Sequence, residues 1–190
     1  GLESTHTARV SAFERTLRQR SKLLREPGWD ARWVASLEET LAEVGTAIAA
    51  QRLDYVARLG AVMAEAGALA SGAAVAVRGD VEQWLEAGPA LEAETRFREA
   101  LFRGRERDSA AGGASSGPHR SDLEVAHASG MPAAQCSTGE QKTLLFAIVE
   151  ADARLVASAG RAPLLLLDEV SAHLDEERRA ALFDAGLGIG

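Results

Sequence analysis

The sequence predicts an α/β fold with a second part that is mostly helical. Two observations lead to this prediction. Four consecutive leucines, residues 164–167, end in the carboxylates Asp168 and Glu169, which is typical of a buried parallel strand that ends at the ligand-binding edge of a sheet. The N-terminal half instead carries apolar residues at helical spacing, broken by Pro and Gly. We therefore expect a helical lobe over residues 1–109 and part of a sheet domain over residues 110–190.

The helical lobe begins with two amphipathic segments. The first covers residues 3–26, and its apolar positions are Val10, Phe13, Leu17 and Leu24. Pro27-Gly28 ends this segment, and Asp30 is a suitable N-cap for the next one. The second segment has a heptad-like apolar seam of Val34, Leu37, Leu41, Val44 and Ile48, which continues more loosely through Tyr55, Leu59 and Val62. Two helices joined by so short a turn form an antiparallel hairpin or belong to an ordinary helical bundle.

Shorter elements complete the lobe and lead into the sheet domain. Residues 74–78 predict a short strand, and residues 81–87 and 91–107 predict helices. Gly and Ser gather in residues 110–117, which form the expected boundary between the two parts. The elements expected beyond it are a strand up to Ala126, an apolar helix over 140–159, the leucine strand, and a last helix over 175–185.

The composition fits a globular protein and limits the classes of function. Hydrophobic residues make up 46% of the chain, and no apolar run is long enough to span a membrane. No export signal is visible, so a cytoplasmic location is expected. The single cysteine, Cys136, excludes an internal disulfide and is either redox-sensitive or a buried thiol. The net charge of −7 is not that of a broadly basic nucleic-acid-binding module.

Positive charge is nevertheless concentrated in two segments, residues 9–25 and 96–107. Basic clusters of this kind can hold a phosphate backbone whatever the net charge of the whole chain. They can equally be solvated faces of helices. The candidate DNA-binding residues in these clusters are Arg15, Arg18, Arg20, Lys22, Arg103, Arg105 and Arg107.

Two short stretches are candidates for chemistry. At the end of a parallel strand, Asp168 can bind the Mg²⁺ that bridges nucleotide phosphates, and Glu169 can orient or deprotonate an attacking water. The alternative for this pair is a plain turn. Ser137-Thr138-Gly139 precedes a helix and would offer N–H groups and a hydroxyl to an anion, unless it is a simple N-cap. The chain contains no G-x-x-x-x-G-K-[ST] phosphate loop.

Three motifs in a fixed order resemble those of ABC-type ATPases. Residues 137–142 (Ser-Thr-Gly-Glu-Gln-Lys) resemble the signature motif, residues 164–169 the Walker B strand, and residues 171–175 the D-loop. Together with Gly117-Pro118-His119-Arg120-Ser121-Asp122-Leu123, they resemble the C-terminal half of the RecF family over roughly residues 96–183. The helical residues before them are similar in character to that family's arm lobe.

The resemblance implies part of an SMC-like P-loop ATPase head that dimerises around ATP. Asp168 would serve Mg²⁺ and Glu169 the attacking water. The signature residues would serve ATP held by the other protomer: Ser137 and Gly139 would contact its γ-phosphate, and Thr138, Glu140, Gln141 and Lys142 complete the motif. Ser171 and Asp175 of the D-loop would lie across the dimer interface. The family's phosphate loop would precede residue 1, so we interpret the chain as a fragment that does not hydrolyse ATP alone.

The implied function is recombinational DNA repair and replication by a slow DNA-dependent ATPase. Its partners would be duplex DNA, single-strand/duplex junctions, RecO, RecR and a second copy of the chain, with ATP and Mg²⁺ as cofactors and no membrane. Such a protein helps to load recombinase at single-stranded gaps in the SOS response to DNA damage. Two alternatives stay open: the ATPase subunit of an ABC transporter, and a helical interaction domain without enzymatic activity, in which Asp168 and Glu169 are structural.

Overall fold

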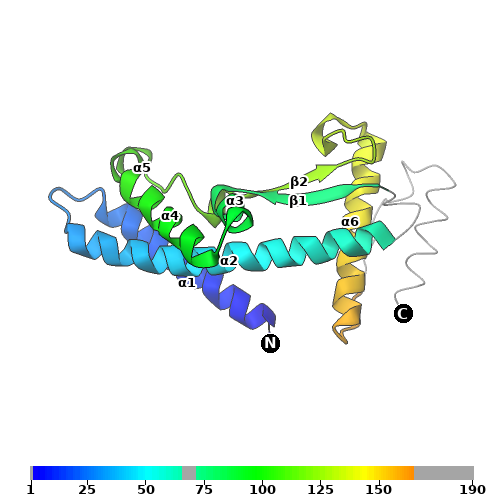
Figure 1. Cartoon of the computed structure of the whole chain (residues 1–190), viewed down its shortest axis with the longest axis horizontal. Coiled ribbons are helices and arrows are strands. Elements are labelled where there is room, and N and C mark those ends of the chain that lie inside the picture. Colours follow the sequence, from blue (N-terminus) through cyan, green and yellow to red (C-terminus); the bar gives the residue numbers. More distant parts are fainter. Residues whose placement is uncertain (1, 66–71, 165–190) are drawn as a thin grey trace. The chain divides into compact units, whose positions relative to one another are not determined.

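The computed structural model describes residues 2–65 and 72–164. The chain divides into two compact units (Figure 1). The first consists of Gly1–Leu53 and Val77–Asp122, and the second of Asp54–Ala76 and Leu123–Gly190. Because the chain enters and leaves each unit, helix α2 and both strands contribute residues to both. The expected boundary between an arm and a head at residues 109 and 110 stays a prediction.

The first unit contains the predicted antiparallel helical hairpin. Its helices are α1 (Leu2–Leu23) and the N-terminal part of α2 (Ala31–Glu65), joined by the loop in between (Figure 1). Arg20 pairs with Glu38, whereas His6, earlier in α1, bonds to Gln51, later in α2. The two helices therefore run in opposite directions. Asp30 is the N-cap that the sequence predicts, because its carboxylate accepts the backbone N–H of Arg32 at 2.8 Å.

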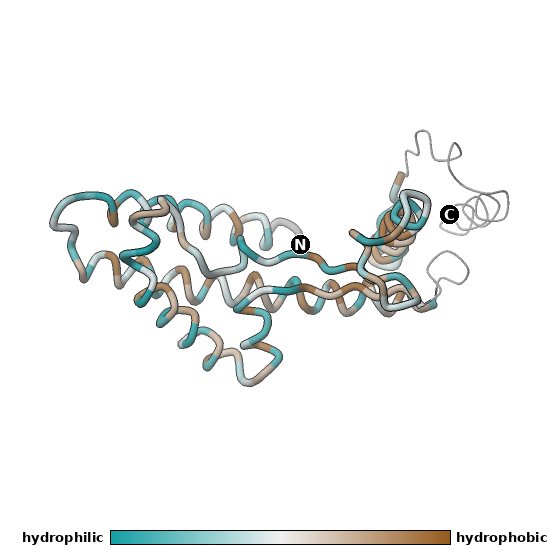
Figure 2. The backbone as a smooth tube through the Cα atoms, turned by 90° about the horizontal axis from the view of Figure 1, so that it is seen from above, coloured by the Kyte–Doolittle hydropathy of each residue, from teal (hydrophilic) through white to brown (hydrophobic). Residues whose placement is uncertain are grey.

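Part of the predicted apolar seam lies in the core of the first unit: Leu41 and Ile48 are buried there, whereas Tyr55, further along the seam, is exposed. Figure 2 shows hydrophobic and hydrophilic residues alternating along these helices. The buried core residues are Phe13, Leu41, Ala42, Ile48, Ala49, Val81, Phe97, Leu101 and Ala114. Gly45 permits the close approach of two aromatic rings, since a Cβ on it would lie 2.6 Å from Phe97 and 2.9 Å from Phe13. A smaller cluster of Leu23, Leu24 and Val34 closes the end of the hairpin at its turn.

Three further helices pack on the hairpin in the first unit: α3 (Asp80–Ala87), α4 (Ala90–Arg103) and α5 (Arg105–Ala111). The single helix predicted over residues 91–107 is wrong, because Gly104 divides it. The Gly104 N–H donates to the Ala100 carbonyl at the end of α4. The Gly104 carbonyl accepts the N–H of Asp108 in α5. Helix α5 then extends into the predicted boundary loop and ends at Gly112, whose φ is 75°.

The second unit is built around helix α6 (Thr138–Ser158) and the C-terminal end of α2. Leu59 and Met63 of α2 form a buried cluster with Ala147 and Ala151 of α6. The sequence predicts short strands at two places, and the structure has β1 (Ala74–Arg78) and β2 (Asp122–Ala126) there. They pair in a two-stranded antiparallel sheet. In the described part of the chain, no helix has both the length and the apolar character that a membrane span requires.

Candidate functional site

The signature-like residues 137–142 form the beginning of α6. Ser137 is its N-cap, and the Ser137 Oγ accepts the Glu140 backbone N–H at 3.4 Å. In return, one oxygen of the Glu140 carboxylate accepts the Ser137 N–H at 2.8 Å and the Ser137 hydroxyl at 2.7 Å. This reciprocal arrangement is a capping box, which follows from the Ser-x-x-Glu spacing. The N-cap prediction is confirmed, and a carboxylate of the chain itself lies at the positive end of the helix.

Gln141 fixes the loop that precedes the helix. Its side-chain amide donates to the carbonyl oxygens of Ala133 at 3.0 Å and Cys136 at 3.1 Å. The thiol of Cys136 is buried, and its Sγ lies 3.5 Å from the Pro132 carbonyl oxygen. In contrast, the space beside Gly139 is open, since a Cβ there would meet nothing within 4 Å. The turn is thus fixed by hydrogen bonds to the preceding loop, and the space beside Gly139 is open.

Helix α6 is positioned by its packing on α2 within the second unit. Beyond the apolar cluster, the Tyr55 hydroxyl of α2 donates to the carboxylate of Asp152 on α6. Burial and, after it, the hydrogen bond to Asp152 together raise the pKa of Tyr55 to about 12. The phenol therefore stays protonated and keeps this hydrogen bond at neutral pH.

The predicted catalytic carboxylates lie outside the described residues. This applies to Asp168 and Glu169 and also to Ser171 and Asp175 of the D-loop. The leucine strand is outside them too, apart from Leu164, which is exposed and belongs to no strand. Over residues 2–65 and 72–164, no group of three or more His, Cys, Asp or Glu side chains could hold a metal ion. The roles of these four residues stay predictions.

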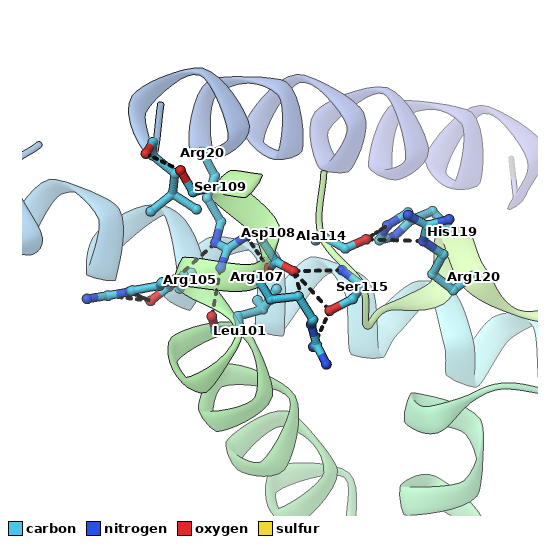
Figure 3. Close-up of polar contacts among 12 residues, drawn as sticks. Arg20, Leu101, Arg105, Arg107, Asp108, Ser109, Ala114, Ser115, His119 and Arg120 are labelled. Atoms are coloured by element: carbon cyan, nitrogen blue, oxygen red, sulfur yellow. Dashed lines mark hydrogen bonds and ion pairs between the residues drawn. The ribbon is translucent and has the colours of Figure 1, made fainter. Parts of the chain in front are cut away.

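Arg20 is excluded from a DNA-contacting surface, and its assignment from sequence is wrong. The side chain is fully buried, although it belongs to a basic segment. Its guanidinium donates to Glu38 at 3.0 Å, to Asp108 at 2.8 Å and to the Leu101 carbonyl at 2.7 Å (Figure 3). A guanidinium with all three nitrogens bonded inside the fold cannot reach a phosphate.

Arg105 is also directed inward. Its side chain is only 11% exposed and forms a bidentate ion pair with Glu38, with Nη2 and Oε2 2.5 Å apart. The same guanidinium stacks between two aromatic rings, 4.6 Å from the centre of Phe102 and 5.3 Å from that of Trp29. Arg105 is therefore a structural residue of this cluster as well, and the DNA-binding prediction for it is withdrawn.

The remaining basic candidates are on the surface. Arg15, Arg18 and Lys22 are exposed and follow one another at steps of three and four, so they share one face of α1. Arg103 and Arg107 are exposed on α4 and α5. Arg103 forms an exposed pair with Glu99 at 2.8 Å, and Arg107 donates to the Ser115 hydroxyl. The structure thus separates each predicted cluster into surface charges and internal ones.

Sequence reasoning missed the polar group formed by residues 114–120. His119 Nε2 and Arg120 Nε lie 3.0 and 3.1 Å from the Ala114 carbonyl oxygen (Figure 3). Arg52 of α2 donates to the carbonyl of Pro118. Burial lowers the pKa of His119, and the charges of Arg120 and Arg52 lower it further, against the opposing effects of the Ala114 bond and Asp108. The motif Gly-Pro-His-Arg was a possible signal, but nothing in the sequence around Arg52 connects it with that motif, which lies 65 residues further along the chain.

Comparison with known proteins identifies relatives along the whole chain. The DNA replication and repair protein RecF of Mesorhizobium japonicum is 46% identical over 187 residues, which cover 96% of this chain and 49% of that protein. RecF of Rhizobium rhizogenes is 47% identical over 96% of this chain and 50% of its own length. RecF of Rhizobium etli is 44% identical over 100% of this chain and 51% of its own length.

The chain belongs to the RecF family. It spans about half the length of the curated relatives it matches. No family model matches it. A solved structure of the recombination mediator protein RecF with ATP, from the RecFOR pathway, has a TM-score of 0.81 and 22% identity, covering 96% of this chain and 50% of that one. The predicted fold class is confirmed: this RecF-family chain has the fold of part of an ABC-type ATPase head with a helical arm.

Proposed function

We propose that the chain is part of an ATP-dependent DNA-repair protein and contributes half of an ATP site that two protomers complete. The protein would bind ATP with Mg²⁺, close head to head around it, and hold duplex DNA next to a single-stranded gap. RecO and RecR would be its partners in loading recombinase there. It would act in the bacterial cytoplasm, where the DNA is.

One observation carries this proposal. The chain is 44–47% identical to three proteins that are named for DNA replication and repair, over 96–100% of its length. The order of its three motifs, with α6 between the first two, supports the same function. A transporter ATPase would share these motifs, but the RecF proteins match the helical part of the chain as well.

The proposed roles divide between two copies of the chain. Asp168 would hold Mg²⁺, and Glu169 would orient the attacking water, on the nucleotide of the same protomer. Ser137 and Gly139 would contact the γ-phosphate on the other protomer, and the open space in front of Gly139 supports this. Because these contacts exist only in the closed dimer, ATP would favour closure through them.

A mixing experiment in a full-length protein that contains this chain tests the proposal. Glu169→Gln should bind ATP and dimerise but not turn over, and Ser137→Arg should block the contact across the interface. Each variant alone is expected to lack ATPase activity. In a mixed dimer, one site pairs the intact Glu169 of one protomer with the intact Ser137 of the other. An equimolar mixture should therefore recover about a quarter of the wild-type turnover, if the dimers form at random.

Sedimentation with ATP provides the control for dimer formation in each variant. If the mixture stays inactive although mixed dimers form, the two residues do not belong to a shared site. Normal steady-state hydrolysis by Glu169→Gln would contradict its role. A protein with no ATP-linked behaviour at all would instead favour the helical interaction domain.

A further inference from the structure

The turn at Pro118–Arg120 gathers positive groups from two parts of the first unit. Arg120 and His119 both contact the Ala114 carbonyl, and Arg52 reaches the turn from α2 to donate to the Pro118 carbonyl. His119 and Arg120 are exposed, and Arg52 is half-buried. Two arginines and a histidine thus contact backbone carbonyls within residues 114–118, and all three side chains have access to solvent.

Arg52 and Arg120 differ from several other described arginines in what they bind. Arg20, Arg105 and Arg103, for example, each have a carboxylate partner. Among the described residues, neither Arg52 nor Arg120 forms an ion pair, and both are anchored by a neutral carbonyl through one nitrogen. The other nitrogens of each guanidinium retain donor capacity, and the two charges raise the local potential. Burial is the largest cause of the lowered pKa of His119, and the charges of Arg120 and Arg52 add to it.

The turn is packed against the core of the first unit. Pro118 is buried, and the His119 ring packs against Phe13 with the ring centres 5.7 Å apart. Gly117 has a φ of 129°, and a Cβ there would lie 2.8 Å from Phe97. Immediately after the turn, the Ser121 hydroxyl donates to the buried Glu82 at 2.7 Å. The positions of the positive groups are therefore fixed before any ligand arrives, which lowers the entropic cost of binding.

We propose that the Pro118–Arg120 turn, together with Arg52, is a phosphate-binding site that takes a phosphodiester of the DNA backbone. The planar guanidinium donates two parallel hydrogen bonds to phosphate oxygens, and an anion between Arg52 and Arg120 would neutralise charges that the fold leaves uncompensated. Contacts to phosphate oxygens carry no information about the bases, so the site would position DNA without regard to its sequence. This inference rests on the proposed DNA-repair function and assigns a contact for it.

The test is DNA affinity measured by fluorescence anisotropy on a short labelled duplex, in a full-length protein that contains this chain. Arg120→Gln is expected to weaken binding on the order of three- to tenfold at about 0.1 M salt, and to reduce the slope of log affinity against log salt by about 1. Arg120→Lys, which keeps the charge, should lose less. The matched control is Arg32→Gln, an exposed arginine about 30 Å away along the same helix as Arg52, which should bind like the wild type.

Two results would overturn the site. One is an Arg120→Gln variant that folds, by its unfolding midpoint, and has the affinity and salt slope of the wild type. The other is a wild-type protein that binds no DNA, which also contradicts the proposed function. In that case inorganic phosphate is titrated in, and its binding is followed through the NMR signals of the His119 ring. A shift that Arg120→Gln abolishes would retain an anion site for a ligand other than DNA, and no shift would remove it.

Discussion

Among the fully buried residues that the structure describes, Arg20 has the largest side chain, and it is charged. Burying a guanidinium is unfavourable unless its hydrogen bonds are made inside the fold. Here they are made by Glu38 of α2, Asp108 of α5 and the end of α4. Asp108 in turn accepts the N–H and hydroxyl of Ser115. One residue of α1 therefore connects this helix to α2 and to the α4–α5 segment.

Removing this guanidinium should be costly. Arg20→Ala takes the 2.8 Å ion pair from the buried Asp108 and one of the two arginine partners from the buried Glu38, so the free energy of unfolding should fall by about 3–5 kcal/mol. The matched control is Arg18→Ala, two positions away in the same helix, where an exposed pair with Glu14 at 3.6 Å is lost. That change should cost less than about 1 kcal/mol. Urea unfolding measures both, and equal losses would show that the buried network contributes little.

His119 should make stability depend on pH. Its lowered pKa means that the folded state disfavours the protonated ring, while the unfolded chain takes up a proton near pH 6.5. The unfolded state thus binds more protons below about pH 6.5, and the free energy of unfolding should fall as the pH falls. His119→Gln should reduce this loss between pH 7.5 and pH 5, measured by urea unfolding. An identical pH dependence in the variant would contradict the assignment.

At the scale of the element, α2 presents two glycines in different surroundings. Gly45 lies where the Phe13 and Phe97 rings approach the backbone most closely. Gly60 has more room, since the nearest atom to a Cβ there would be Val75 Cγ2 at 3.5 Å. Both are interior helix positions, where Gly is less favourable than Ala by roughly 0.5–1 kcal/mol. The difference between the two sites is therefore a difference in packing.

Alanine at these two positions should have opposite effects. Gly45→Ala forces two aromatic rings to move and should lower the free energy of unfolding by about 1–3 kcal/mol. Gly60→Ala should be neutral or stabilise the protein by up to about 1 kcal/mol, because it gains helix propensity without a clash. Thermal unfolding of the two variants makes the comparison. Destabilisation of similar size at both positions would mean that close packing is not what selects Gly45.

At the scale of the whole molecule, what could be predicted followed from local patterns. The hairpin was predictable because apolar residues at steps of three and four define one face of each helix. The capping box was predictable from Ser137 and its spacing to Glu140. The break at Gly104 was not, because a glycine within a helical pattern is tolerated as often as it ends the helix.

The basic clusters show why local patterns fail for sites. Counting charges along residues 9–25 does not distinguish Arg20 from Arg18, since the partners Glu38 and Asp108 come from other helices. The same limit hid Arg52, whose contact with the Pro118 carbonyl depends on the tertiary fold. The half-site proposed at α6 could be predicted from sequence because a signature-like motif is contiguous. A high density of basic residues in the sequence predicts a basic surface only where the fold provides no carboxylate partners for them.

The capping box at α6 implies competition at the helix end. The Glu140 carboxylate accepts both donors of Ser137 and so engages the hydroxyl that an incoming oxygen anion would use. A ligand there must displace a tethered anion that is already present at high effective concentration. Weakly charged anions would lose this competition, while a polyphosphate would gain more from the helix dipole than the carboxylate gives up. Glu140 would thus set a threshold of charge for occupancy of the signature turn.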